Sequence, residues 1–438
     1  MLQRALLGVL GLLLVLPAFG QPERPKLEGE LTLEQAVQYS LAHHLAVAVS
    51  QAEMRAARAR TSEAEAAFRP KLGLGVYLNA GDTDMIVSGA PGVEPGFWTN
   101  LPGGGLSTNL SLMLPLYTGG RLQARLAQAK AGERTALARL ALTMREKARD
   151  VRKAFFELLQ ARSELDAAAW ELAQQEELLR IVRERQSVGR VARYVVLRVE
   201  AEVASARQKV NDSNAGTETA MINLKNAMGV DPGSSFTLTA PVPEPLPEGE
   251  LEDIVSAALA ERADLAVARY AAEAADRRVA EVLSEYAPQL ALYAMAEARQ
   301  PELAGPTPFD GGYQVGLVLS WSLYDGGERG ARREEAEAMR QARLLEARQL
   351  EYDVAAEVER ERARWKAALE NEKLAGTEVT AAEEELRIAR MRFELGRGIH
   401  LEVLDALATL RRARTNRIQA AYRRGLAESD FLFATGRY

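Results

Sequence analysis

The 438-residue chain contains no cysteine and only three histidines. The lack of cysteine excludes disulfides, zinc–thiolate centres and a lipid-modified N-terminal cysteine. The only imidazoles are those of His43, His44 and His400, and no Gly-rich loop is followed by Lys-Ser or Lys-Thr. The two adjacent histidines point about 100° apart on a helix and make a poor metal pair. We therefore predict no catalytic, cofactor-binding or metal-binding residues, and no enzyme activity.

Long apolar runs are also scarce. The apolar run 5–16, followed by the small residues Ala18 and Gly20, predicts a cleaved secretory signal peptide over residues 1–20. An uncleaved anchor helix needs about 20 apolar residues, and the run is too short for one. No later segment approaches about 18 consecutive apolar residues, so any membrane-spanning part of the mature protein must be built from strands.

The chain also lacks an excess of basic residues. It carries 55 Lys and Arg against 61 Asp and Glu, a net charge of −6. This balance argues against nucleic acid as a partner.

Four segments alternate apolar with small or polar residues, as strands with two different faces do. They are 72–79, 106–117, 290–298 and 313–324, and they form two predicted β-hairpins, 71–117 and 289–324. Between the first two, residues 80–105 are Gly-rich and predict a long loop. Each strand has the length that a tilted strand needs to cross a bilayer, about 9–11 residues.

Both hairpins lead through a Gly-Gly pair into very long Ala-, Arg- and Glu-rich helices, predicted over 121–188 and 328–395. Each helix is about 100 Å long at 1.5 Å per residue. Shorter helices are predicted at 194–228 and 401–434, and one precedes each hairpin, the second of them over 251–286. Thr32 is the expected N-cap of an early helix.

The spacing of these features indicates an internal duplication. The pairs Gly119 and Gly326, Gly189 and Gly396, and Gly229 and Gly436 are each 207 residues apart. We assign residues 21–229 to the first repeat, 230–250 to a Pro-rich linker and 251–438 to the second repeat.

Two architectures remain open at this point. The helices alone suit a structural periplasmic coiled-coil protein without a pore. The strands favour a membrane protein, because two soluble hairpins would leave their apolar faces without a partner. Four strands cannot close a barrel, whereas three chains would supply twelve.

With these features assembled, the mature chain resembles the TolC-like outer-membrane efflux family along essentially its whole length. The resemblance is carried by Pro70 and Pro288 before the hairpins, the joints LYTGG at 116–120 and LYDGG at 323–327, and the glycines that interrupt the helices. It implies a mainly α fold with a transmembrane β part. In this fold a homotrimer forms a 12-stranded β-barrel that continues into a long periplasmic α-helical barrel.

The resemblance also implies a function and partners. The protein would be the outer-membrane channel-tunnel of a tripartite efflux or type I secretion system, a passive exit duct for small molecules, ions or polypeptides. Its partners would be a periplasmic adaptor, an inner-membrane pump or ABC transporter, and outer-membrane lipid. The sequence identifies neither the transported substrate nor the particular adaptor and pump.

Candidate functional residues follow from the same resemblance. Glu402 and Asp405 lie six and nine positions after Gly396, where family members carry acidic residues that line the periplasmic aperture. The first repeat has Val195 and Arg198 at the equivalent positions. Family members often bridge the two helix breaks with an Asp–Arg pair, which Val195 and Gly398 cannot supply, so the latch is not identified.

The two helix breaks are the expected docking points for the adaptor, and the strand-to-helix joints are the expected exit from lipid. The docking residues are Val188, Gly189, Arg190, Leu395, Gly396 and Arg397. The joint residues are Tyr117, Gly119, Gly120, Tyr324, Gly326 and Gly327.

Overall fold

The computed structural model describes residues 26–79, 85–88, 98–101, 105–239, 241, 246, 249–300, 310–395 and 397–437. The predicted signal peptide, residues 1–20, lies outside these ranges, as do parts of the predicted linker at 230–250 and of the predicted loop at 80–105.

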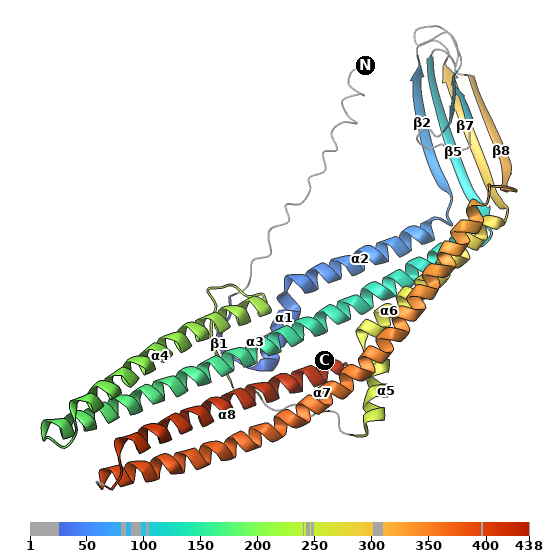
Figure 1. Cartoon of the computed structure of the whole chain (residues 1–438). Coiled ribbons are helices and arrows are strands. Elements are labelled where there is room, and N and C mark those ends of the chain that lie inside the picture. The colour runs from blue at the N-terminus through green and yellow to red at the C-terminus, as the bar shows by residue number, and fades with distance from the viewer. Residues whose placement is uncertain are drawn as a thin grey trace, which may run out of the picture.

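The described chain is mainly helical, with a four-stranded sheet standing at one end of a long pack of helices (Figure 1). The helices are α1 (Leu33–His43), α2 (Leu45–Ala66), α3 (Arg121–Ser187), α4 (Arg193–Met228), α5 (Leu251–Glu261), α6 (Ala263–Leu283), α7 (Glu328–Glu394) and α8 (His400–Ala434). The strands are β1 (Glu28–Leu31), β2 (Lys71–Asn79), β3 (Met85–Ser88), β4 (Trp98–Leu101), β5 (Gly105–Tyr117), β6 (Ser235–Leu238), β7 (Gln289–Gln300) and β8 (Asp310–Ser320).

Helices α3 and α7 form the length of the molecule. Each has 67 residues, contains no proline, and starts after a glycine in the left-handed region, Gly120 at φ 90° and Gly327 at φ 95°. Toward the sheet, α2 and α6 pack beside them. At the other end, α4 pairs with α3 and α8 pairs with α7, while α3 and α8 join the two pairs (Figure 1).

The segment 251–286, predicted as one helix, is divided into α5, α6 and a final 3-10 turn. Arg262 between α5 and α6 has an extended backbone, with φ −68° and ψ 129°. Asp264, in the first turn of α6, accepts a hydrogen bond from the Leu265 N–H at 2.9 Å, and a carboxylate in the first turn stabilises the start of a helix. His44, between α1 and α2, has nearly the same backbone angles and caps α2 by accepting from the Ala46 N–H at 3.0 Å.

The sheet is antiparallel in the order β2-β5-β7-β8. Residues directly opposite one another share a face, so the register assigns each side chain to one of two faces. One face is almost wholly apolar and contains Leu72, Leu74, Val76, Leu78, Leu106, Leu110, Leu112, Leu290, Leu292, Tyr313, Val315, Leu317 and Leu319. The other is mostly small or polar, although Met113, Met295 and Val318 also belong to it, and contains Gly73, Gly75, Tyr77, Ser107, Asn109, Ser111, Tyr293, Gln314 and Gly316.

Two strand predictions need correction. The last strand was expected to reach Tyr324, but β8 ends at Ser320. There the Trp321 indole N–H donates to the carbonyl oxygen of Tyr286 at 3.0 Å, which directs the chain toward the helices. The predicted loop at 80–105 contains a short antiparallel pair, β3 with β4.

A belt of mixed structure, made of β1, β6, α1, α5 and the end of α8, lies at the middle of the helical pack. Strand β1 pairs in parallel with β6, and the core beneath them joins α1, α3 and α4. The predicted N-cap Thr32 is confirmed: its hydroxyl accepts from the Gln35 N–H at 3.2 Å, and the Gln35 side chain accepts from the Thr32 N–H at 3.0 Å.

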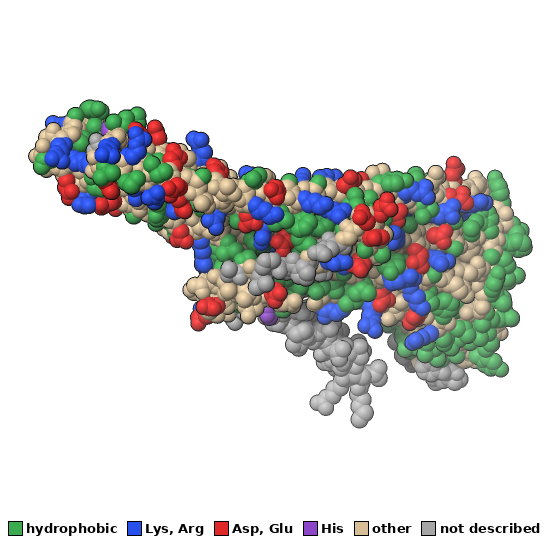
Figure 2. Space-filling view, turned by 90° about the horizontal axis from the view of Figure 1, so that it is seen from below, with side chains coloured by type: hydrophobic (Ala, Val, Ile, Leu, Met, Phe, Trp, Pro, Cys, Tyr) green, Lys and Arg blue, Asp and Glu red, His purple; other side chains and the backbone are tan. Residues whose placement is uncertain are grey.

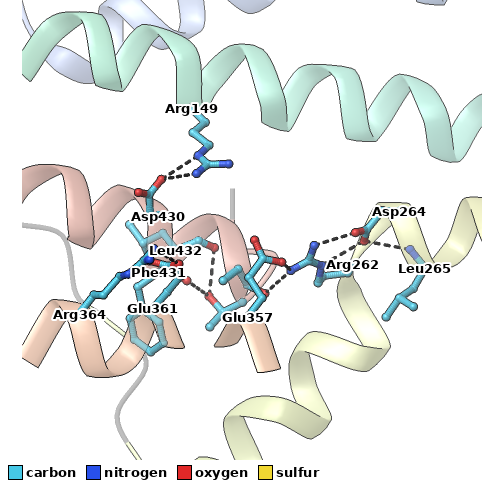
Figure 3. Close-up of polar contacts among 12 residues, drawn as sticks. Arg149, Arg262, Asp264, Leu265, Glu357, Glu361, Arg364, Asp430, Phe431 and Leu432 are labelled. Atoms are coloured by element: carbon cyan, nitrogen blue, oxygen red, sulfur yellow. Dashed lines mark hydrogen bonds and ion pairs between the residues drawn. The ribbon is translucent and has the colours of Figure 1, made fainter. Parts of the chain in front are cut away.

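A network of buried ion pairs ties the second half of the belt together (Figure 3). The Arg262 side chain is 8% exposed and donates to Asp264 at 2.7 Å, to Glu357 on α7 at 2.5 Å, and to the Ala434 carbonyl oxygen at 3.1 Å. Burial favours a higher pKa for Asp264, but the hydrogen bonds and charge of Arg262 outweigh this and lower that pKa. One guanidinium therefore holds α6, α7 and the end of α8 together.

Replacing this guanidinium should be strongly destabilising. Arg262→Ala leaves two partly buried carboxylates and a carbonyl oxygen without their donor, and should lower the free energy of unfolding by about 3–5 kcal/mol. The measurement is urea unfolding of the purified protein. Arg269→Ala is the control, because Arg269 is half exposed and pairs with Glu351 at 2.8 Å, a contact expected to contribute less than about 1 kcal/mol. Equal small losses in both variants would contradict the prediction.

Candidate functional site at the hairpin tips

The two helix breaks predicted from the sequence lie at the end of the molecule farthest from the sheet (Figure 1). One tip, residues 188–192, joins α3 to α4, and the other, 395–399, joins α7 to α8. Gly189 adopts φ 74°, a value that suits glycine, and so permits the first turn. Gly396, the predicted centre of the second, lies outside the described residues.

A single hydrophobic core lies beneath both tips and receives side chains from all four helices. Because the core is shared, the two hairpins of one chain form one packed unit at this end. Its buried members are Leu178, Val182, Val195, Val196, Val199, Val379, Ala382, Leu386, Ala389, Phe393, Val403, Ala406, Leu407, Leu410 and Ala413.

The two predicted aperture acids lie one turn apart near the start of α8. A Glu402 carboxylate oxygen is 3.4 Å from the Arg392 guanidinium at the end of α7. Asp405 is exposed, and no ion pair to it occurs among the residues that the structure describes. The two carboxylates therefore differ in how far their charge is compensated.

Val195 and Gly398, which cannot form the Asp–Arg pair of family members, have different surroundings. Val195 is 3% exposed and belongs to the shared core. Gly398 sits in a tight space, where an added Cβ would lie 3.1 Å from a Glu402 carboxylate oxygen and 3.2 Å from the Phe393 backbone nitrogen. A larger residue at this position would require these neighbours to shift slightly.

A contact that the sequence did not predict joins the two hairpins. The Arg185 guanidinium of α3 lies over the Phe393 ring of α7, 4.0 Å from its centroid, and donates to the Phe393 carbonyl oxygen at 3.4 Å. No spacing rule could have found this contact, because its residues lie on different helices, 208 positions apart.

The outer surface of the tips combines apolar and basic side chains. Val188, Leu395 and Ile399 are 59–67% exposed. Arg190 and Arg397 are exposed beside them. Predicted docking residues from both hairpins thus share one end of the molecule.

His400, the first residue of α8, is partly buried. Burial, followed by the positive charge of Arg198 on α4, lowers the pKa of its imidazole. The neutral form is therefore favoured in the folded tip.

The predicted strand-to-helix joints lie at the opposite end, beside the sheet (Figure 1). Gly119 and Gly326 have φ 63° and 69°, and both Gly-Gly pairs adopt left-handed backbone angles. At the second joint, Asp325 accepts from the Gly327 N–H and the Arg329 N–H, both at 3.1 Å.

Among the described residues, no group of three or more His, Cys, Asp and Glu side chains has an arrangement suited to a metal ion. Likewise, none of the described helices is both long and apolar enough to span a membrane.

Comparison with known proteins gives a family and a fold. The family model described as outer membrane efflux protein matches residues 36–230 and 254–437. No curated protein matches the chain.

Three solved structures illustrate the likeness. The outer membrane protein VceC from Vibrio cholerae is 19% identical, with a TM-score of 0.76 over 92% of this chain and 96% of that one. The CmeC outer membrane channel from Campylobacter jejuni is 16% identical, with a TM-score of 0.78 over 92% and 85%. The open state of the MtrE outer membrane channel from Neisseria gonorrhoeae is 18% identical, with a TM-score of 0.76 over 92% and 88%.

Acid should weaken the tips through His400. Its lowered pKa in the folded state means that the unfolded chain binds the proton more readily, so stability falls as pH drops through the ordinary histidine range. His400→Gln should lose less stability than the parent protein between about pH 7.5 and pH 5.5. Urea unfolding at the two pH values measures this, with His43→Gln on α1 as the control. An identical pH dependence in His400→Gln and the parent would refute the prediction.

Proposed function

The chain belongs to the outer membrane efflux protein family, and we propose that it is the passive exit duct of a tripartite efflux or type I secretion system. In this proposal its strands lie in the outer membrane, its helices extend through the periplasm, and three copies assemble into one duct.

The apolar face of the sheet is the observation that carries the proposal. Its large side chains on β2 and β8 are 60–87% exposed. Hydrophobic side chains gather at the sheet end, at the right of Figure 2, whereas charged side chains are spread over the helices. A continuous apolar face of this extent matches the lipid-facing side of a membrane sheet, and the mostly small and polar opposite face matches a lumen.

The free edges of the same sheet support assembly. Within the described chain, β2 and β8 each pair on one side only. In lipid every backbone polar group needs a partner, so the edges must pair with those of other copies. Three chains would form the twelve strands expected from the sequence, and the 67-residue helices would extend the duct by about 100 Å.

The joints would then lie where the chain leaves the bilayer. Trp321 and Tyr324 are exposed next to the second joint, and Tyr117 is exposed next to the first. Tryptophan and tyrosine are enriched at membrane–water boundaries, because one part of the ring system is apolar and another is polar.

At the far end, Glu402 and Asp405 would each form a ring of three carboxylates in the trimer. Such rings concentrate negative potential and favour cations. Arg392 lies beside Glu402, so the uncompensated charge falls mainly on the Asp405 ring.

The tips are the proposed docking surface for a periplasmic adaptor, which would connect the duct to an inner-membrane pump or ABC transporter. The apolar side chains of Val188, Leu395 and Ile399, with the exposed Arg190 and Arg397, fit a partner whose apolar residues are flanked by carboxylates. The alternative, a structural coiled-coil protein without a pore, gives the apolar sheet face no role.

A test of the membrane assignment compares the two faces of β8. The purified protein should be a detergent-requiring trimer that conducts in planar lipid bilayers. Leu317→Lys places a charge on the proposed lipid face and should reduce assembled trimer sharply, since such a charge costs about 2–4 kcal/mol near the bilayer midplane. Gln314→Lys, on the opposite face of the same strand, should assemble and conduct.

Several outcomes would contradict the proposal. A protein released by osmotic shock as a soluble monomer would support the coiled-coil alternative. Equal assembly of the two lysine variants would show that the apolar face does not meet lipid.

A second test addresses the aperture. Asp405→Asn should reduce cation selectivity more than Glu402→Gln, because Arg392 already offsets the charge of Glu402. Reversal potentials in a potassium chloride gradient measure selectivity, and Glu394→Gln at the end of α7 is the control for charge elsewhere on the tip. Unchanged selectivity in the Asp405→Asn, Glu402→Gln double variant would remove both residues from the aperture.

A further inference from the structure

The contact between Arg185 and Phe393 has the geometry of a strong cation–π interaction. The guanidinium carbon is 4.0 Å from the ring centroid, and Phe393 is 7% exposed. Both terminal nitrogens of Arg185 also point to the Phe393 carbonyl oxygen, at 3.4 Å each. Because Arg185 itself is partly buried, this contact is less screened by water than a surface ion pair.

Phe393 lies near a proposed aperture acid, Glu402. The Phe393 backbone nitrogen and the Glu402 carboxylate bound the same small space at Gly398, at 3.2 Å and 3.1 Å from the position of an added Cβ. Arg392, next to Phe393, is 3.4 Å from the Glu402 carboxylate. Phe393 and Glu402 therefore lie on either side of Gly398, and an ion pair joins Arg392, the residue next to Phe393, to Glu402.

Other polar contacts between α3 and the second hairpin lie farther from the tips, among them the pair of Arg149 with Asp430 at 2.6 Å. Gln174 accepts a hydrogen bond from Arg390, Glu171 lies 3.6 Å from Arg411, and Arg414 lies 3.8 Å from the centre of a Trp170 ring system. From position 170 to Arg185 the helix rises about 22 Å. Arg185 makes the inter-hairpin polar contact nearest the tips among the described residues.

We propose that Arg185 is a positioning residue that seats the α7–α8 tip on α3 and thereby holds Glu402 in the closed aperture. This inference rests on the proposed function, since it assigns a role in a duct. It gives a physical basis for closure in a chain whose Val195 and Gly398 cannot form an ion pair between the two breaks. The closing contact within each protomer is then a guanidinium on an aromatic ring rather than a carboxylate–guanidinium pair.

Single-channel recording in planar lipid bilayers tests the proposal. Arg185→Ala should raise the fraction of time in the high-conductance state about tenfold, because the α7–α8 tip loses its contact with α3. Phe393→Leu should give a similar rise, since leucine fills the core but offers no ring face. Arg185→Lys should stay close to the parent protein, because an ammonium group can also lie over the ring.

Arg183→Ala is the matched control. Arg183 is two positions away on the same helix and pairs with Glu200 within the first hairpin at 2.6 Å. This variant removes the same charge but leaves the contact between hairpins intact, so its open fraction should match that of the parent. A larger effect of Arg183→Ala than of Arg185→Ala would overturn the proposal.

A rescue experiment exploits the absence of cysteine from the chain. The Arg185→Ala variant receives two cysteines, Gln174→Cys and Arg390→Cys. Bridging these cysteines with a short bifunctional maleimide should restore the low open fraction. Without the bridge, the triple variant should remain open. A protein with the two cysteines but with Arg185 intact measures how far the cysteine substitutions alone open the channel. Failure of the bridge to close the channel would contradict the proposed role.

Hydrogen exchange separates this inference from the proposed function. Arg185→Ala should accelerate exchange at both tips relative to Arg183→Ala, whether or not the protein conducts. A parent protein that forms no pore would refute the duct itself. Faster exchange without a change in open fraction would refute only the link from Arg185 to the aperture.

Discussion

An open β-sheet cannot lie in hydrocarbon with its edge backbone groups unpaired, and this constraint would govern the arrangement of the molecule in the proposed duct. The sheet has free edges at β2 and β8 and an apolar face that water would not favour. Placed in lipid, each unpaired N–H or C=O would cost several kcal/mol. Pairing with other copies would satisfy both edges at once, and it would also arrange the attached helices around a common axis. The proposed duct therefore follows from the sheet, although helices make up most of the chain.

The two strand-to-helix joints have the same backbone conformation but different neighbouring atoms. At the first, a Cβ on Gly119 would lie 2.4 Å from the Cβ of Ala287, so glycine is required for space as well as for its left-handed angle. At the second, nothing lies within 4 Å of such an atom on Gly326, and only the angle calls for glycine. The repeated Gly-Gly pair thus reflects one turn, which packs tightly against the residues that follow α6 in only one of its two positions.

Local patterns in the sequence predicted the long helices and the faces of the strands well, because period and glycine placement determine them. The patterns were less informative where tertiary partners decide. The helix break at Arg262 depends on a buried network that includes Glu357, almost a hundred residues away. The early end of β8 depends on a hydrogen bond from Trp321 to Tyr286. In the sequence, Phe393 is one of several apolar residues on its helix, and only the structure shows that Arg185 lies over its ring.

The distribution of polar contacts suggests which part of the molecule moves. In the belt, the Arg262 side chain is 8% exposed and binds two carboxylates and a helix end, so separating these elements would leave buried charges unpaired. At the tips, Arg392 and Glu402 are much more exposed and 3.4 Å apart, a contact that contributes little. The regions of lowest local stability are those that open first. A duct built this way would keep its belt fixed while its tips respond to a partner, and the contact of Arg185 with Phe393 would set how readily they do so.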